Sequence, residues 1–239
     1  MLRLVRVTKR YPDGPGMITA LDAVDVEVGD GAFVAVMGPS GSGKTTLALI
    51  AAGVESPTSG EVWIDELDVA HARKAKRAVL RRQKVGVVFQ SGELDPLLSA
   101  VENVALPLRL DGWRAARAGA AAREALCRCA VEGLASRFPG ELSGGQRQRV
   151  AVARAVVGER RLVVADEPTA SVDTATARAI VELLASLAAD GVGVLMTTHD
   201  SRLAGFADEV VVLRDGARVQ AAGPTVGHGR HDRWEEANL

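Results

Sequence analysis

The chain has 239 residues, of which 47% are hydrophobic and 3% aromatic, and 29 Lys and Arg against 30 Asp and Glu give a formal charge of −1. This length and composition favour a folded α/β domain and exclude wholesale disorder. The near-neutral charge argues against a protein that holds nucleic acid by its phosphates. Two cysteines, Cys127 and Cys129, cannot form a disulfide scaffold. Without an apolar run of about 20 residues or a signal-peptide core, we expect a soluble cytoplasmic protein.

Short apolar runs rich in β-branched residues dominate the first third of the chain and predict strands. Residues 11–16 contain two prolines and two glycines and therefore predict a loop between the first two strands. The expected elements are strands Leu2–Val7, Val24–Val28, Phe33–Met37, Glu61–Ile64 and Val85–Phe89, with helices Lys44–Ala52 and Lys74–Gln83.

Between about residues 100 and 131 the composition changes to alanine, leucine and arginine, which predicts a helical insertion broken at Gly112. Strands and helices then alternate again, as is typical of a parallel sheet covered on both faces. The polar stretch 223–239 predicts a flexible tail. The expected later elements are a helix after Ser143, strand Leu162–Ala165, helix Thr174–Ala189, strand Val192–Thr197, a short helix after Asp200 and strand Glu209–Leu213.

A glycine-rich segment, GPSGSGKT, lies between the third predicted strand and the next helix and fits the pattern G-x-x-x-x-G-K-[ST]. Successive backbone N–H groups at a helix N-terminus can hold a triphosphate only where side chains stay clear. Lys44 would neutralise the β- and γ-phosphates, and the Thr45 hydroxyl would be a ligand of Mg²⁺. The alternative is a glycine-rich turn that matches by chance. The candidate nucleotide-binding residues are Gly38, Pro39, Ser40, Gly41, Ser42, Gly43, Lys44, Thr45 and Thr46.

The apolar strand 162–165 is followed directly by Asp166 and Glu167. Two adjacent acids can divide the work, one serving a cation and the other polarising an attacking water. Pro168 ends the strand at this point. Taken alone, the motif is a strand before an acidic turn; together with the phosphate loop it predicts a hydrolytic site.

The segment Leu142-Ser143-Gly144-Gly145-Gln146 begins a predicted helix, with Ser143 and Gln146 forming a capping box. Capping does not explain two adjacent glycines, whereas an anion close to this helix N-terminus would. In this segment the sequence resembles the ABC (ATP-binding cassette) ATPases, whose signature is LSGGQ. The resemblance implies that Ser143, Gly144, Gly145 and Gln146 bind ATP held by the other subunit of a head-to-tail dimer.

Four further positions match the family pattern, although each alone has a structural explanation. By resemblance, Gln90 contacts Mg²⁺ and senses the membrane partner, and His199 bonds the γ-phosphate. Asp173 matches the aspartate of the loop at the dimer contact, and Tyr11 matches the aromatic that stacks on adenine. The catalytic candidates are Glu167, His199, Gln90 and Lys44, and the candidate Mg²⁺ ligands are Thr45, Gln90 and Asp166.

Within the family, the sequence is most similar to a subgroup that serves lipoprotein release, macrolide or peptide efflux and cell-division signalling. Segments 35–44, 57–62, 101–108 and 165–169 carry this resemblance. It implies an α/β P-loop NTPase with a mainly parallel sheet flanked by helices and an N-terminal antiparallel β subdomain. The expected ATPase domain covers residues 1–222, with a helical subdomain inserted at about 92–157.

The resemblance further implies that the chain hydrolyses ATP with Mg²⁺ and moves an integral membrane permease in export or mechanotransmission. Its other partner is a second copy or a similar cassette, and the permease holds it at the inner face of the membrane. Residues 91–96 and the pair Ser171-Val172 depart from the subgroup pattern. The alternative is a non-transport ABC ATPase acting on DNA or ribosomes, although such proteins usually carry two cassettes or a long coiled coil. A cassette without hydrolytic activity is disfavoured by Glu167 and His199.

Overall fold

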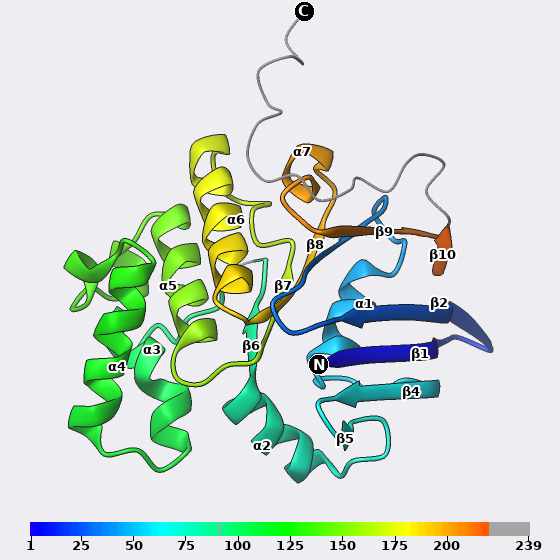
Figure 1. Cartoon of the computed structure of the whole chain (residues 1–239), viewed down its shortest axis with the longest axis horizontal. Helices are drawn as coiled ribbons and strands as arrows, with labels where there is room; N and C mark the ends of the chain where they lie inside the picture. The colour runs from blue at the N-terminus through cyan, green and yellow to red at the C-terminus, as the bar shows by residue number, and fades with distance from the viewer. Residues whose placement is uncertain (91, 220–239) are drawn as a thin grey trace, which may run out of the picture.

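The computed structural model describes residues 1–90 and 92–219, so Ser91 and the expected tail at 223–239 lie outside the described part. Its larger sheet has the strand order β10-β9-β3-β8-β7-β6, in which β10 is antiparallel to β9 and all other neighbours are parallel (Figure 1). The strands are β3 (Phe33–Met37), β6 (Val85–Val88), β7 (Leu162–Asp166), β8 (Gly193–Thr198), β9 (Glu209–Arg214) and β10 (Ala217–Val219).

A second, antiparallel sheet has the order β2-β1-β4-β5, formed by β1 (Leu2–Asp13), β2 (Gly16–Val28), β4 (Ser59–Ile64) and β5 (Leu67–Asp68). The prediction of a loop over residues 11–16 is therefore wrong, because β1 and β2 remain paired as far as Asp13 and Gly16 and leave only a tight turn between them. Pro12 is tolerated since β4 pairs with β1 only as far as Thr8, which leaves one side of β1 unpaired beyond that point. Gly14, at φ 54°, supplies the turn.

Helices cover both faces of the larger sheet. The side chains of β7 alternate, so that Leu162 and Val164 pack in one core with α1 and the antiparallel sheet. Val163 and Ala165 pack in a second core with α3, α4, α5 and α6. The helices are α1 (Lys44–Ala51), α2 (Lys74–Lys84), α3 (Ala100–Leu110), α4 (Ala115–Arg128), α5 (Gly144–Val156), α6 (Thr174–Ala189) and α7 (Ser201–Ala204).

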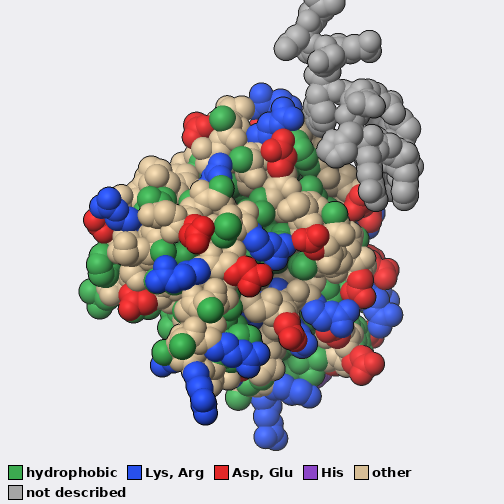
Figure 2. All heavy atoms as spheres, turned by 60° about the vertical axis from the view of Figure 1, so that its left-hand side comes forward, with side chains coloured by type: hydrophobic (Ala, Val, Ile, Leu, Met, Phe, Trp, Pro, Cys, Tyr) green, Lys and Arg blue, Asp and Glu red, His purple; other side chains and the backbone are tan. Residues whose placement is uncertain are grey.

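The fold class expected from the sequence is confirmed: α3, α4 and α5 lie between β6 and β7 in the chain, and Gly112 separates α3 from α4. Figure 2 shows acidic and basic side chains interspersed over the face that it presents. The exposed ion pair Arg128–Asp190 joins α4 to the end of α6, and Arg178–Glu182 joins two turns of α6. Within residues 1–90 and 92–219, no helix combines the length and apolarity required to cross a bilayer.

Candidate functional site

The glycine-rich segment between β3 and α1 forms a tight loop that has no room for a side chain at Gly38 or Gly43. Gly41 and Gly43 have φ values of 78° and 101°, where residues with a side chain are strained. A Cβ added at Gly38 would lie 2.3 Å from the carbonyl oxygen of Leu213, and one at Gly43 would lie 2.3 Å from that of Ala20. Glycine at these positions lets the loop pack closely on its neighbours as it enters α1, and a helix N-terminus of this kind suits an anion.

Two side chains of this loop face inward. The Lys44 ammonium donates hydrogen bonds to the carbonyl oxygens of Gly38 and Pro39, at 2.8 and 3.0 Å. The Ser42 hydroxyl is buried and has no hydrogen-bond partner among the described residues. An orphaned buried hydroxyl, next to a lysine whose ammonium is directed at the loop's own carbonyls, fits a loop that takes up phosphate. Pro39, Ser40, Gly41 and Thr45 are exposed, and Thr46 is half-buried.

The end of β7 is organised by Thr197, a residue to which the sequence analysis gave no role. The Thr197 hydroxyl donates to Asp166 Oδ1 at 2.6 Å and accepts the backbone N–H of Glu167 at 2.9 Å. Asp166 is buried, at 7% exposed, and Thr197 is fully buried. A polar residue closing an otherwise apolar buried strand is the sequence signal that could have identified Thr197.

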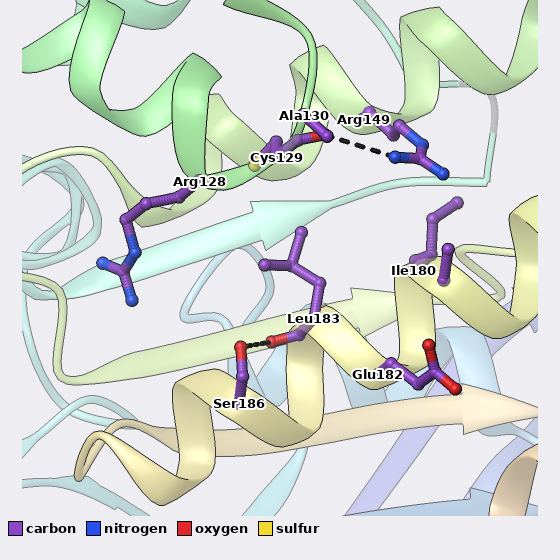
Figure 3. A pocket seen from close by; sticks show the side chains of 9 residues that line it. Arg128, Cys129, Ala130, Arg149, Ile180, Glu182, Leu183 and Ser186 are labelled. Carbon is purple, nitrogen blue, oxygen red and sulfur yellow. Dashed lines mark hydrogen bonds between the residues drawn. The ribbon is translucent and has the colours of Figure 1, made fainter.

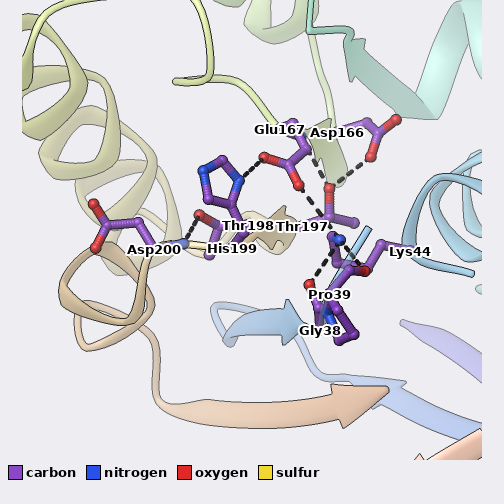
Figure 4. A network of polar contacts seen from close by, with 9 residues as sticks. All are labelled: Gly38, Pro39, Lys44, Asp166, Glu167, Thr197, Thr198, His199 and Asp200. Carbon is purple, nitrogen blue, oxygen red and sulfur yellow. Dashed lines mark hydrogen bonds and ion pairs between the residues drawn. The ribbon is translucent and has the colours of Figure 1, made fainter. Parts of the chain in front are cut away.

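Glu167 joins two other candidate residues, Lys44 and His199, into one network (Figure 4). Its Oε1 lies 3.6 Å from Lys44 Nζ, and its Oε2 lies 2.7 Å from His199 Nδ1. An ionised carboxylate can only accept hydrogen bonds, so this geometry assigns the proton to His199 Nδ1. The Glu167 backbone has φ 46°, a region that non-glycine residues adopt rarely and that clusters at functional sites.

The network occupies the carboxyl ends of the parallel strands, where open α/β sheets bind ligands. Lys44, Asp166, Glu167 and His199 are therefore brought together as the sequence suggested. Asp166 and the Thr45 hydroxyl supply oxygen donors of the kind that Mg²⁺ prefers. No cluster of three or more His, Cys, Asp or Glu side chains able to hold a metal occurs in residues 1–90 and 92–219.

No hydrogen bond or ion pair described for residues 1–90 and 92–219 joins Gln90 to this network. It is exposed after β6, and its backbone carbonyl accepts the Ser171 hydroxyl at 3.3 Å. The buried Gln148 of α5 donates to the carbonyl of the neighbouring Phe89 at 3.2 Å. The segment that carries Gln90 is thus linked to the start of α5 and to the loop after β7.

The capping box expected at the start of α5 is confirmed. Gln146 N–H donates to Ser143 Oγ at 3.2 Å, and the Ser143 N–H donates to Gln146 Oε1 at 2.9 Å. A Cβ added at Gly145 would lie 2.8 Å from the Thr176 side chain, and one at Gly144 would lie 3.5 Å from the Ser171 carbonyl. Glycine at position 145 therefore allows the start of α5 to approach the first turn of α6 closely, whereas Gly144 is in ordinary contact with the loop before it.

Asp173 caps α6 beside this helix start. Its carboxylate accepts from Thr176 N–H at 3.0 Å and from the Thr176 hydroxyl at 2.6 Å. The hydroxyl bond, followed by the backbone bond, lowers the pKa of Asp173. Because α5 and α6 pack on the opposite face of the sheet from α1, no described hydrogen bond or ion pair joins Ser143–Gln146 to the phosphate loop.

Tyr11 lies near the end of β1 rather than in a loop. Its hydroxyl donates to Glu55 Oε2 at 2.6 Å, and the Lys9 ammonium lies 4.9 Å from the centre of its ring.

A cavity of about 310 Å³ lies between α4, α5 and α6, away from the network (Figure 3). Its polar groups are paired locally: Ser186 donates to the Leu183 carbonyl at 2.7 Å, and Arg149 donates to the Cys129 carbonyl at 3.5 Å. Burial raises the pKa of the Cys129 thiol to about 12, so the thiol stays neutral.

Comparison with known proteins shows which family has this arrangement. The family model described as ABC transporter matches residues 21–170. The chain belongs to the ABC transporter family.

The relatives agree with the subgroup suggested by the sequence. The cassette is 41% identical over 222 residues to the uncharacterized ABC transporter ATP-binding protein MJ0796 of Methanocaldococcus jannaschii, covering 90% of the cassette and 94% of that protein. It is 42% identical over 217 residues to the lipoprotein-releasing system ATP-binding protein LolD of Syntrophotalea carbinolica, covering 90% and 96%. The macrolide export ATP-binding/permease protein MacB 1/2 of Paracoccus denitrificans is 40% identical over 219 residues, covering 92% of the cassette but 33% of that longer protein.

A solved structure supports the same assignment. The dimeric post-hydrolysis state of the cassette MJ0796, bound to ADP and Pi, has a TM-score of 0.87 and 39% identity and covers 92% of this chain and 97% of that one. The expected family, fold and subgroup resemblance are thus confirmed, and the alternative role on DNA or ribosomes is not favoured.

Proposed function

We propose that this cassette hydrolyses ATP as the ATP-binding subunit of an export or mechanotransmitting complex and moves a membrane permease by closing and opening a dimer. The observation that carries the proposal is the Glu167 carboxylate held between the ammonium of the phosphate loop and the His199 ring. The printed names of LolD and MacB, a lipoprotein-releasing and a macrolide export protein, support the coupling to transport.

In this proposal Lys44 and the backbone N–H groups of residues 40–46 bind the phosphates and stabilise the charge that develops on the transferring group. Glu167 orients the attacking water and accepts its proton. Thr45, Gln90 and Asp166 would hold Mg²⁺, which would supply positive charge to offset that of the phosphates. Thr197 fixes Asp166 and the Glu167 backbone, so the two acids keep distinct directions.

His199 has to change its bonding when ATP enters. Phosphate oxygens only accept hydrogen bonds, and the His199 Nδ1–H is given to Glu167 at 2.7 Å. Contact with the γ-phosphate therefore requires one of two changes: the Nδ1–H turns from Glu167 to the phosphate, or Nε2 gains a second proton. The first change releases the Glu167 carboxylate as the substrate arrives, whereas the second leaves its 2.7 Å bond to His199 Nδ1 in place.

The signature residues Ser143–Gln146 act, in this proposal, on ATP bound by a second copy. The separation of α5 from α1 by the sheet supports this arrangement, because one chain does not bring the two helix starts together. The dimeric MJ0796 structures, 39% identical to this cassette, are further support. Asp173 lies next to the same surface and would face the partner.

Mixing two inactive variants tests the composite site. Lys44→Ala disables the phosphate loop, and Ser143→Arg blocks the signature with a bulky side chain. In a mixed dimer one loop and the opposing signature are both intact, so the mixture regains up to about a quarter of wild-type ATPase activity while each variant alone is inactive.

The matched controls are ATP binding and circular dichroism of Ser143→Arg alone, because its phosphate loop is unchanged. A mixture as inactive as its components, with both variants folded, would show that each chain holds a complete site and would overturn the proposal.

The permease link is tested by purification from membranes. The full chain, expressed at its natural level with an affinity tag, is expected to bring down an integral membrane protein in detergent. Recovery of ribosomes or DNA without any membrane protein would contradict the proposed role and its location at the membrane.

A further inference from the structure

The Tyr11 side chain is fixed by residues to which the sequence analysis gave no role. Its hydroxyl donates to Glu55 Oε2 at 2.6 Å. The other carboxylate oxygen, Oε1, lies 2.8 Å from the Lys9 ammonium. Lys9 in turn donates to the Ser56 carbonyl at 2.9 Å and lies over the Tyr11 ring, 4.9 Å from its centre. These contacts hold both the tip and one face of the ring.

The same contacts tie the ring to the helix that begins at the phosphate loop. Glu55 follows α1, and its backbone N–H donates to the carbonyl of Leu49 within that helix at 3.2 Å. Lys9 and Tyr11 are two residues apart on β1, so their side chains leave the strand on the same side. Glu55 therefore links an aromatic ring on β1 to the helix that presents the phosphate-binding amides, beside a hydrogen bond between the side chains of Tyr11 and Thr46.

We propose that Glu55 is a positioning residue that holds the Tyr11 ring as a stacking platform for the nucleotide base, with Lys9 occupying the opposite face of the ring. This inference rests on the proposed ATP-binding function and extends it to residues outside the phosphate loop. A platform fixed before the nucleotide arrives does not lose rotamer freedom on binding, and affinity rises accordingly. Stacking uses the face of the base, so the effect is shared by ATP and GTP.

The protonation states agree with these roles. Burial, followed by the Glu55 carboxylate, raises the pKa of Tyr11, so the phenol keeps the proton that it donates. Burial acts to raise the pKa of Glu55, but the hydrogen bonds from Lys9 and Tyr11 outweigh it and lower the value. The pair is thus a phenol donor and an ionised acceptor at neutral pH.

The test compares ligands with and without a base. Glu55→Ala and Tyr11→Phe both remove the 2.6 Å bond, and Tyr11→Phe keeps the ring. Each variant is expected to raise KM and the calorimetric Kd for ATP and for GTP about 3- to 10-fold, with kcat changed less than about twofold. Binding of tripolyphosphate, which has no base, is expected to match the wild type.

Glu61→Ala is the matched control, because Glu61 also accepts a hydrogen bond from an aromatic side chain, that of Trp63 at 2.9 Å, on the neighbouring strand β4. It is expected to leave all three ligands unaffected. Glu55→Gln keeps an acceptor for the phenol in a side chain of the same shape and is expected to lie between Glu55→Ala and the wild type. Urea unfolding of each variant establishes that the full chain is folded.

The outcomes distinguish the role of Glu55 from the role of Tyr11. If Tyr11→Ala weakens ATP binding and Glu55→Ala does not, Tyr11 is still the stacking platform but the role proposed for Glu55 is overturned. Unchanged ATP affinity in Tyr11→Ala removes the platform itself. Equal losses for ATP and tripolyphosphate in Glu55→Ala would mean that Glu55 supports α1 in general, and this also overturns the inference.

Discussion

The two faces of the parallel sheet carry the two halves of the site in different ways. On the α1 face, the polar groups of Lys44, Glu167 and His199 bond to one another across the ends of three elements. On the α5–α6 face, Ser143 and Asp173 satisfy the ends of their own helices within three residues. The first arrangement is long-range and has to be rearranged by a ligand, whereas the second is local and complete without one.

The two faces also differ in where backbone strain is found. Glu167 is held in a rarely adopted backbone conformation, an arrangement that costs about 1–3 kcal/mol and persists only where neighbours enforce it. On the helical face the described residues include a similar backbone position at Ala130, with φ 56°, but it is exposed after α4 and takes no part in the apolar core. Substitutions on the first face should therefore mainly change turnover, and those on the second should mainly change folding.

The largest expected effect is on the α1 face. Glu167→Gln removes the group that accepts the proton of water and is expected to lower ATP turnover about 10²- to 10⁴-fold while ATP binding is retained. Steady-state phosphate release and nucleotide binding measure the two quantities separately. Glu182→Gln is the control, because that carboxylate lies on the surface of α6 and pairs with Arg178 at 2.7 Å. Near-normal turnover in Glu167→Gln would remove Glu167 from its proposed role.

On the helical face the expected effect is on folding. The side chain of Asn103, fully buried at the start of α3, accepts from Asp95 N–H at 2.7 Å and donates to the carbonyls of Asp95 and Leu98 at 3.0 and 2.9 Å. Asn103→Ala leaves these groups unpaired and should lower the free energy of unfolding by about 2–4 kcal/mol. Urea denaturation measures this loss.

Nucleotide affinity of the folded fraction of Asn103→Ala should stay near the wild-type value, since the phosphate loop lies across the sheet. The exposed Arg123 on α4 provides the control, with a change within about 0.5 kcal/mol for Arg123→Ala. An affinity loss as large as that of a phosphate-loop variant would show that the two faces are coupled before the dimer forms.

The smallest effect concerns the contact between α2 and the end of α3. The Gln83 amide, and after it the Arg82 guanidinium, lower the pKa of Asp111. A carboxylate with a lowered pKa in the folded state stabilises above its unfolded pKa, and this stabilisation disappears as the pH falls through the folded pKa. Asp111→Asn should thus be less stable than wild type by at most about 1 kcal/mol at pH 7, with no difference near pH 2. A difference that grows on acidification would contradict this assignment.

Local patterns allowed much of the site to be predicted. The phosphate loop, the acids after β7 and the capping box at Ser143 each depend on residues close in sequence, so spacing alone indicates them. The hairpin after Tyr11 was missed, because prolines normally break strands and the freedom of β1 beyond Thr8 depends on where β4 ends. Thr197 and Glu55 were missed, because their partners are 31 and 44 residues away.

The sequence alone determined the order of strands and helices, the glycine loop and the identity of the acids, because these follow from periodicity, backbone sterics and side-chain chemistry within a few residues. The tertiary structure decided which distant groups share a hydrogen bond and which face of the sheet each helix covers. Those outcomes depend on how the strands are ordered side by side, and strand order is fixed by the packing of the whole core rather than by any segment on its own.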